Sequence, residues 1–171
     1  MNKGIKKTGT PSWEELKASP GLPDEDRLEK GPVAFIECVQ EIPCNPCEEA
    51  CPFNAIEVGT PITNLPKLNG EKCTGCGLCI AACPGLAIFR VHKNYTDSTS
   101  LVEFPFEYYP LPEEGETVNC VNREGKFITK GRVVRVRNPE RFDSTPLITV
   151  EIPKEFYLEV RSMERKRCKG C

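Results

Sequence analysis

The feature that most constrains this chain is a run of four closely spaced cysteines that ends in proline. The run reads Cys73-Thr74-Gly75-Cys76-Gly77-Leu78-Cys79-Ile80-Ala81-Ala82-Cys83-Pro84, with the spacing C-x2-C-x2-C-x3-C-P. Cysteines two residues apart are badly matched to disulfide geometry, so the loop is better suited to wrap a metal centre. The glycines permit backbone angles that a side chain would resist, and they let amides approach the sulfurs.

A second cysteine loop lies earlier in the chain and makes the sequence internally repetitive. It reads Cys38-x5-Cys44-x2-Cys47-x3-Cys51-Pro52, so its first two cysteines are three residues further apart. The segment 51–56 aligns with 83–88, and each ends in a short apolar strand, 56–58 or 88–91. A short helix is expected before each aligned segment, at 48–50 and 78–82, and another strand at 33–37. Two similar halves predict a pseudo-two-fold domain over residues 33–93.

Eleven cysteines in 171 residues indicate either a disulfide framework or metal binding. A secreted chain would favour disulfides, whereas a cytosolic chain keeps its thiols reduced and favours metal. Zinc knuckles use two cysteine pairs set well apart around a closed tetrahedron. Four close cysteines followed by proline, present twice, fit iron–sulfur binding better than either alternative.

The complete motif resembles that of the bacterial two-cluster ferredoxins, over about sixty residues. In that family the fourth cysteine of each loop ligates the other cluster, so the resemblance implies two [4Fe–4S] clusters with crossed ligation. Cys38 departs from the family spacing; if it is no ligand, its cluster would be a three-iron form or would borrow a ligand. The implied ligands are Cys38, Cys44, Cys47 and Cys83 for cluster one, and Cys73, Cys76, Cys79 and Cys51 for cluster two.

The N-terminal extension, residues 1–32, is polar and rich in turns. Ser12 and Glu15 fit a capping box at the start of a short helix, and 24–30 fits another helical turn or two. The extension has too few apolar residues for a core of its own, so we expect it to lie on another surface, its own domain or a partner's. We expect docking to a partner, in which case deleting residues 1–30 should leave both clusters in place.

After a polar linker at 94–100, residues 101–163 predict short strands separated by turns. The expected strands are 116–121 and 127–136 around a turn at 122–125, then 147–152, a helical turn at 153–157, and a last strand at 158–160. These predict a small open barrel. The fold class is therefore α+β, a pseudo-two-fold dicluster ferredoxin domain followed by a small all-β domain, with a tail at 164–171.

Seven further residues of the C-terminal part leave alternatives open. Phe104, Phe106, Tyr108 and Tyr109 could line a contact surface or fill the barrel core. Cys168-x2-Cys171 could complete a metal site with Cys120, but a tail of free thiols and a buried Cys120 is the simpler reading.

Electron transfer is the function that these patterns favour. The sequence has no G-x-G-x-x-G fingerprint and no P-loop, and its only histidine, His92, has no evident catalytic partner. We therefore assign no catalytic residue. The net charge of −2 and the lack of a dense basic stretch argue against nucleic acid, and the lack of long apolar runs argues against membrane insertion and a signal peptide. We expect a cytoplasmic protein.

The C-terminal pattern (111–115, 133–136 and 150–153) is similar to tails on small ferredoxin subunits of multi-subunit flavin dehydrogenases, such as those acting on proline or hydroxyproline. This resemblance implies flavoprotein dehydrogenase subunits as partners, with FAD on those chains and not on this one. The alternatives are a freely diffusing ferredoxin and a regulatory or scaffold iron–sulfur protein.

Overall fold

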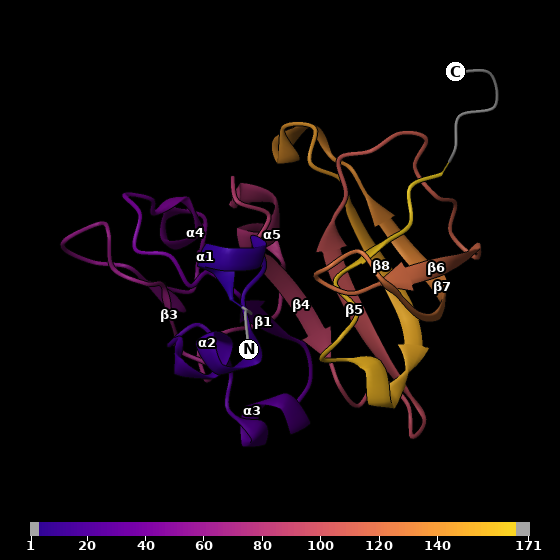
Figure 1. Ribbon diagram of the computed structural model, residues 1–171, viewed down its shortest axis with the longest axis horizontal. Coiled ribbons are helices and arrows are strands. Elements are labelled where there is room, and N and C mark those ends of the chain that lie inside the picture. The colour runs from indigo at the N-terminus through magenta and orange to yellow at the C-terminus, as the bar shows by residue number, and fades with distance from the viewer. Residues whose placement is uncertain (1–3, 167–171) are drawn as a thin grey trace.

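The computed structural model describes residues 4–166, which form a large antiparallel sheet with a few short helices (Figure 1). The five α-helices gather at one end of the molecule and strands β6–β8 at the other. The helices are α1 (Ile5–Thr8), α2 (Trp13–Ala18), α3 (Glu25–Glu29), α4 (Pro46–Glu49) and α5 (Leu78–Ala82), with 3-10 turns η1 (Glu140–Phe142) and η2 (Lys154–Phe156). The strands are β1 (Val33–Ile36), β2 (Ile56–Glu57), β3 (Lys67–Leu68), β4 (Ile88–His92), β5 (Thr99–Pro105), β6 (Thr117–Val121), β7 (Phe127–Arg137), β8 (Leu147–Pro153) and β9 (Ser162–Met163).

The cysteine-rich part has the two similar halves that the repeat predicts. Each half runs strand, cysteine loop, helix, strand: β1-α4-β2 in the first and β3-α5-β4 in the second. The outer strands β1 and β4 pair antiparallel, the inner strands β2 and β3 do the same, and α4 contacts α5. Strand β3 carries no clear alternation in the sequence and was not anticipated. Pairing across the halves brings the second loop's last cysteine next to the first loop.

The sheet does not end where the ferredoxin part ends. Strand β4 pairs with β5, with Arg90 opposite Glu103, and the full order is β1-β4-β5-β8-β7-β6-β9. The expectation of a linker at 94–100 is therefore wrong. These residues include a turn between two paired strands, and Ser100, fully buried in β5, donates its hydroxyl to the Lys93 carbonyl. The expected division into two domains is not confirmed, since one sheet runs through both parts.

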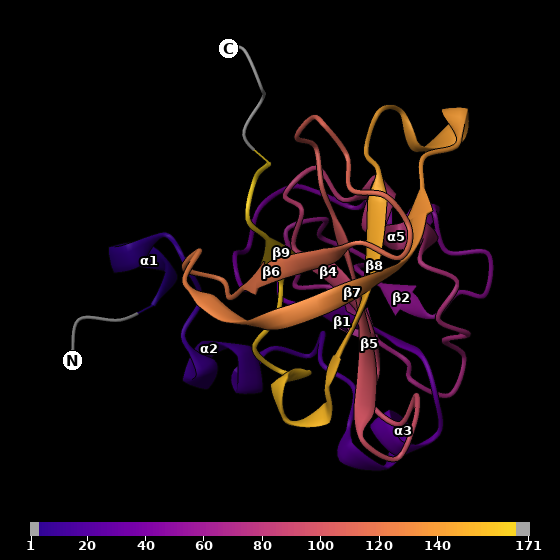
Figure 2. The ribbon, with the colours of Figure 1, turned by 90° about the vertical axis from the view of Figure 1, so that its right-hand side faces the viewer.

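The C-terminal strands bend sharply within the continuous sheet (Figure 2), and a separate open barrel is not confirmed. The first half of β7 pairs with β6 and the second half with β8, and its register with β8 shifts between Val133 and Arg135. Figure 2 shows β6 and β7 crossing β5 and β8 steeply. The ladder stays open, with β1 and β9 at its edges. The predicted turn at 122–125 is confirmed, whereas the strand predicted at 158–160 is wrong: the Val160 amide bonds back to Phe156, and the final strand is β9.

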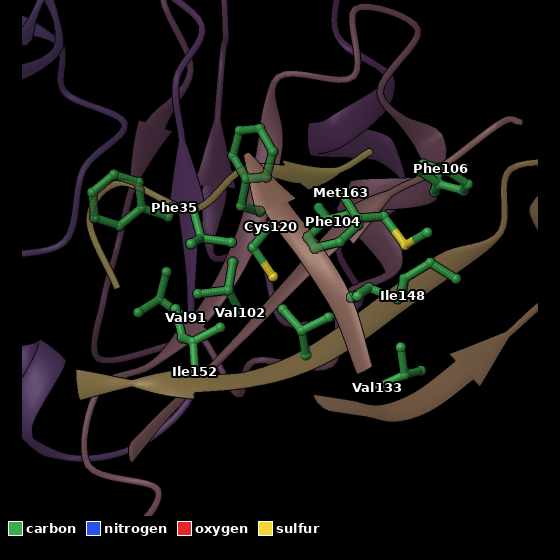
Figure 3. Close-up of a cluster of buried hydrophobic side chains, with 14 of the residues drawn as sticks. Phe35, Val91, Val102, Phe104, Phe106, Cys120, Val133, Ile148, Ile152 and Met163 are labelled. Atoms are coloured by element: carbon green, nitrogen blue, oxygen red, sulfur yellow. The ribbon is translucent and has the colours of Figure 1, made fainter. Parts of the chain in front are cut away.

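The main hydrophobic core lies beneath this bent sheet and contains residues from both parts of the chain (Figure 3). Phe35 and Val91 from the ferredoxin part share the core with Val102, Phe104 and residues of β6–β9. A common core explains why the two parts form a single body, because separating them would expose apolar surface at about 25 cal/mol per Å².

Burial separates the four aromatic residues into two pairs and places Cys120 in the core. Phe104 and Phe106 lie in the chain's own core, whereas Tyr108 and Tyr109 are exposed. Cys120 is completely buried in the core, as Figure 3 shows. Cys168 and Cys171 lie outside the described residues.

Residues 16–32 pack on the chain's own ferredoxin part. Leu16 and Leu28 are buried, and the backbone amides of Ile36 and Leu68 donate to carbonyls in the segment, at Gly21 and Pro20. The capping box of α2 is present, and Asp24 caps α3. Of the two surfaces expected to order this segment, the chain's own domain is the one observed.

Candidate iron–sulfur centres

Two apolar cavities in the ferredoxin part are each lined by four cysteines. The first, called the cluster-two pocket, lies between α5 and the start of the Cys51 segment; its walls include Ala34, Ile56 and Ile80. Its cysteines are Cys51, Cys73, Cys76 and Cys79. Three of them come from one loop and the fourth from the other half of the repeat.

The second cavity, called the cluster-one pocket, has the reciprocal composition: its cysteines are Cys38, Cys44, Cys47 and Cys83. Cys38 lines the pocket with the other three, despite its unusual spacing. The enlarged loop is closed by the segment 59–66, because the Cys44 amide donates to the Ile62 carbonyl at 3.1 Å and Asn64 and Pro66 line the pocket.

These two sets fit a pair of cubane clusters with the crossed ligands named from the sequence. A cubane takes one thiolate at each of four iron corners, so its cysteines surround a volume. Among residues 4–166, no group of three or more histidine, cysteine, aspartate or glutamate side chains is arranged to hold a single metal ion. The grouping of the thiols is observed, and the ligation remains a prediction.

Two glycines of the Cys73–Cys83 loop are required by close packing as well as by backbone angle. Gly75 has a φ of +66°, and a Cβ there would lie 2.6 Å from the Pro32 carbonyl oxygen. Gly77 has a φ of +80°, and a Cβ there would collide with the Arg137 guanidinium and lie 2.8 Å from a Glu103 carboxylate oxygen. A side chain at either position would therefore displace the loop that presents the thiols.

Backbone amides donate to sulfur at equivalent places in the two halves. The Ala55 amide lies 3.3 Å from Cys51 Sγ, and the Ala87 amide lies 3.4 Å from Cys83 Sγ. These two cysteines are the ones that cross between the halves. A third amide, that of Ala34 in β1, lies 3.4 Å from Cys73 Sγ. Such contacts stabilise negative charge on sulfur and so favour the thiolate and a reduced cluster.

Burial disfavours the thiolate form in the absence of iron. It raises the pKa of Cys47 to about 11 and also raises the pKa values of Cys79 and Cys83. Neighbouring thiols add to the shift at all three. A bound cation would reverse this balance because ligating thiols are deprotonated, so cluster assembly should release protons.

The cluster-two loop is held by a buried ion network from β4 and strands of the C-terminal part. Glu103 in β5 is fully buried; it accepts from Arg137 at 3.0 and 2.7 Å, pairs with Arg90 at 3.1 Å and accepts from the Thr149 hydroxyl at 2.9 Å. The two arginines also donate to the loop's backbone, Arg137 to Cys76 at 3.1 Å and Arg90 to the residue before it at 3.2 Å.

A single side chain of the N-terminal segment anchors the start of the same loop. Arg27 is buried and donates to four backbone carbonyls: Cys73 and Gly70 at 2.7 Å each, Pro32 at 2.8 Å and Gly31 at 3.2 Å. The N-terminal segment therefore contributes to the site although it supplies no ligand.

A second network lies on the opposite side of β1 from the pockets. Glu37, next to Cys38, accepts from Arg123 and from Arg161. Arg161 is stacked between two rings, 4.8 Å from Phe35 and 5.2 Å from Phe89, and burial lowers its pKa to about 10. Successive strand residues face opposite sides, so Ile36 lines the cluster-one pocket while its neighbours face this network.

Sequence reasoning missed both networks. The available signal was a charged residue inside an apolar strand, as in Phe89-Arg90-Val91 and Val102-Glu103-Phe104. Such a residue is rarely buried without a partner. The single histidine, His92, packs edge-on against the Tyr95 ring at 5.9 Å, away from the cysteine sets.

Comparison with known proteins covers the cysteine-rich part best. Residues 37–87 match the family model described as a 4Fe-4S dicluster domain. No solved structure matches the chain. None of the helices within residues 4–166 has the length and apolar character needed to cross a membrane.

Three curated relatives illustrate the range of matches. The chain is 31% identical to protein Pixie of Drosophila melanogaster over 107 residues, which are 53% of this chain and 17% of that protein. It is 53% identical over 38 residues, 22% of this chain and 11% of the other, to one subunit of the Na(+)-translocating ferredoxin:NAD(+) oxidoreductase complex of Acetobacterium woodii. It is 50% identical over 48 residues, 28% of this chain and 27% of the other, to the polyferredoxin-like subunit of aliphatic sulfonate oxidoreductase of Pyrococcus furiosus.

The chain thus spans less than a third of each of these relatives. The match, the repeat and the two cysteine-lined pockets agree on the same stretch, so residues 37–87 form a 4Fe–4S dicluster domain of the ferredoxin type.

Proposed function

We propose that this chain is the electron-transfer subunit of a flavin-containing oxidoreductase, relaying single electrons through two [4Fe–4S] clusters. The observation that carries the relay is the pair of pockets, each lined by four cysteines drawn from both halves of the repeat. Cubane clusters with full cysteine ligation exchange one electron at a time. The chain's own residues hold the clusters, shield them with apolar walls and supply amide donors to the sulfurs.

Exposed apolar side chains beside the pockets support assembly with a partner. Ile42 lines the cluster-one pocket and Phe53 the cluster-two pocket, yet each is nearly half exposed, as is Ile62. Large apolar groups around a redox centre are suited to a protein contact that excludes water. Two of the relatives described above are named as subunits of oxidoreductases, which agrees with this proposal.

The flavin part of the proposal rests on the resemblance of the C-terminal segment to ferredoxin subunits of flavin dehydrogenases. FAD would lie on the partner chains, which would oxidise an amino or hydroxy acid and pass electrons to this subunit. A cytoplasmic location agrees with the many free thiols, because that compartment keeps cysteines reduced.

Anaerobic purification of the native protein from its host tests this proposal. We expect about eight iron and eight sulfide per chain, a native mass well above that of the single chain, and FAD in the same fraction. Zinc instead of iron would overturn the cluster assignment. A monomer with eight iron and no flavin would overturn the complex and leave a freely diffusing ferredoxin. Clusters that neither accept nor donate electrons reversibly would indicate a regulatory or scaffold role.

A further inference from the structure

Charged residues are distributed unequally around the two pockets. Beside the cluster-two pocket, Arg90 and Arg137 share the single carboxylate of Glu103, which leaves one positive charge in excess. Both arginine side chains are less than a fifth exposed, and both donate to carbonyls of the cluster-two loop. Charges that are shielded from solvent in this way are weakly screened and act strongly at short range.

Among residues 4–166, those that line the cluster-one pocket include no arginine or lysine, whereas Arg90 lines the cluster-two pocket. Residues 38–49 and 59–66, which form the cluster-one loop and the segment that closes it, contain three glutamates and neither lysine nor arginine. Arg123 and Arg161 share the carboxylate of Glu37, which likewise leaves one positive charge in excess, but neither arginine lines the cluster-one pocket, and Arg161 lies against Phe35 and Phe89. The three glutamates are Glu41, Glu48 and Glu49.

Hydrogen bonding to sulfur occurs in both pockets, and the solvent exposure of the cysteines does not differ. Backbone amides donate to Cys51 and Cys73 of cluster two and to Cys83 of cluster one. Each pocket has one buried cysteine, Cys79 at 7% and Cys47 at 8% exposed, and three of intermediate exposure. The charged residues therefore distinguish the two pockets, and burial does not.

Reduction adds one negative charge to a cluster, so nearby positive charge and amide donors favour the reduced form. Resting on the function proposed above, we propose that the Arg90–Glu103–Arg137 network raises the reduction potential of cluster two above that of cluster one. An electron on this chain would then reside mainly on cluster two, and cluster one would be the less reducible site. The three residues act through charge and loop position and are positioning residues.

Two substitutions of opposite sign test this role by reductive titration of the holoprotein, followed by electron paramagnetic resonance. Arg137→Gln removes positive charge and leaves Glu103 paired with Arg90 and Thr149. We expect the cluster-two potential to fall, shifting the electron's distribution between clusters about tenfold, which corresponds to ~59 mV for one electron. Glu103→Gln removes the negative charge, and we expect the potential of the same cluster to rise.

The controls separate charge from loop structure. Arg137→Lys keeps the positive charge and loses the two-pronged guanidinium contact with Glu103, so the cluster-two potential should stay near that of the wild type. If Arg137 had a purely structural role, Arg137→Lys would change the potential as much as Arg137→Gln does. Arg123→Gln alters the other network and should leave the cluster-two potential unchanged. Ligand variants Cys51→Ser and Cys83→Ser assign the two signals. If Glu103→Gln does not fold, the difference in cluster-two potential between Arg137→Gln and Arg137→Lys still distinguishes a charge effect from a structural one.

The inference is overturned if Arg137→Gln and Glu103→Gln shift the cluster-two potential in the same direction, or if Arg137→Gln does not shift it. It is also overturned if cluster one has the higher potential in the wild-type protein. Iron and sulfide are measured first: a chain lacking clusters refutes the proposed function, whereas eight iron with unshifted potentials refutes only this inference.

Discussion

Replacing Arg27 with methionine should loosen the start of the cluster-two loop. Methionine keeps much of the side-chain length and removes the guanidinium. The carbonyls of Cys73, Gly70 and Pro32 then lose hydrogen bonds of 2.7–2.8 Å, and the carbonyl of Gly31 loses one of 3.2 Å. Taking about 1 kcal/mol for each of the three short hydrogen bonds gives a loss of about 3 kcal/mol. For a chain of this size, that corresponds to a fall in Tm of about 6–12 °C.

The assay is anaerobic thermal unfolding of the holoprotein at one fixed scan rate, followed by cluster absorbance and tryptophan fluorescence. Lys30→Met is the matched control: Lys30 pairs with Glu71, so it bridges the same segment to the same loop, but the pair is exposed. Exposed pairs contribute little, so its Tm should not change measurably. Equal shifts in the two variants, or a shift below about 2 °C for Arg27→Met, would refute the reasoning.

This anchor also changes what a truncation can test. The sequence suggested that deleting residues 1–30 would leave both clusters in place, but Arg27 holds the backbone of Cys73. The deletion should therefore lower cluster-two occupancy as well as stability. Substitutions of exposed residues in the segment are the cleaner test of docking.

Three further predictions concern individual residues. Cys51→Ala should damage the cluster of the following loop and Cys83→Ala that of the preceding loop; magnetic resonance showing loss of the sequence-local cluster each time would reject crossed ligation. Gly77→Ala should reduce the iron content to about half, because the added methyl would collide with the Arg137–Glu103 salt bridge. In Gly85→Ala the added methyl would lie 4.0 Å from Cys83 Sγ, so this variant should retain its full iron content. Burial raises the pKa of Cys120 to about 12, so its thiol stays protonated and unreactive at pH 7–9; peptide mapping after alkylation of the native holoprotein should find it unmodified, and rapid labelling would contradict its burial.

Local patterns in the sequence determined the chemistry of this chain. The cysteine spacing and the following prolines predicted two sets of four thiols, and the resemblance to two-cluster ferredoxins implied that the halves exchange Cys51 and Cys83. The sequence also predicted the capping box at Ser12 and the turn at 122–125, and both are present in the structure. In each case the interacting groups lie within a few residues of one another or in equivalent positions of a repeat. Spacing alone is then enough to fix the geometry.

Only the tertiary structure decided how the parts meet. Polar residues 94–100 read as a linker because composition does not reveal that Arg90 and Glu103 pair across a turn. Arg137 donates to the carbonyl of Cys76, 61 residues away in the sequence. Arg27 donates to the carbonyl of Cys73, 46 residues away. Contacts at such separations form only when the gain from the shared core and network exceeds the entropy of closing the loop. A strand's alternation shows that a charged residue faces inward, but the identity of its partner depends on which distant strand lies beside it.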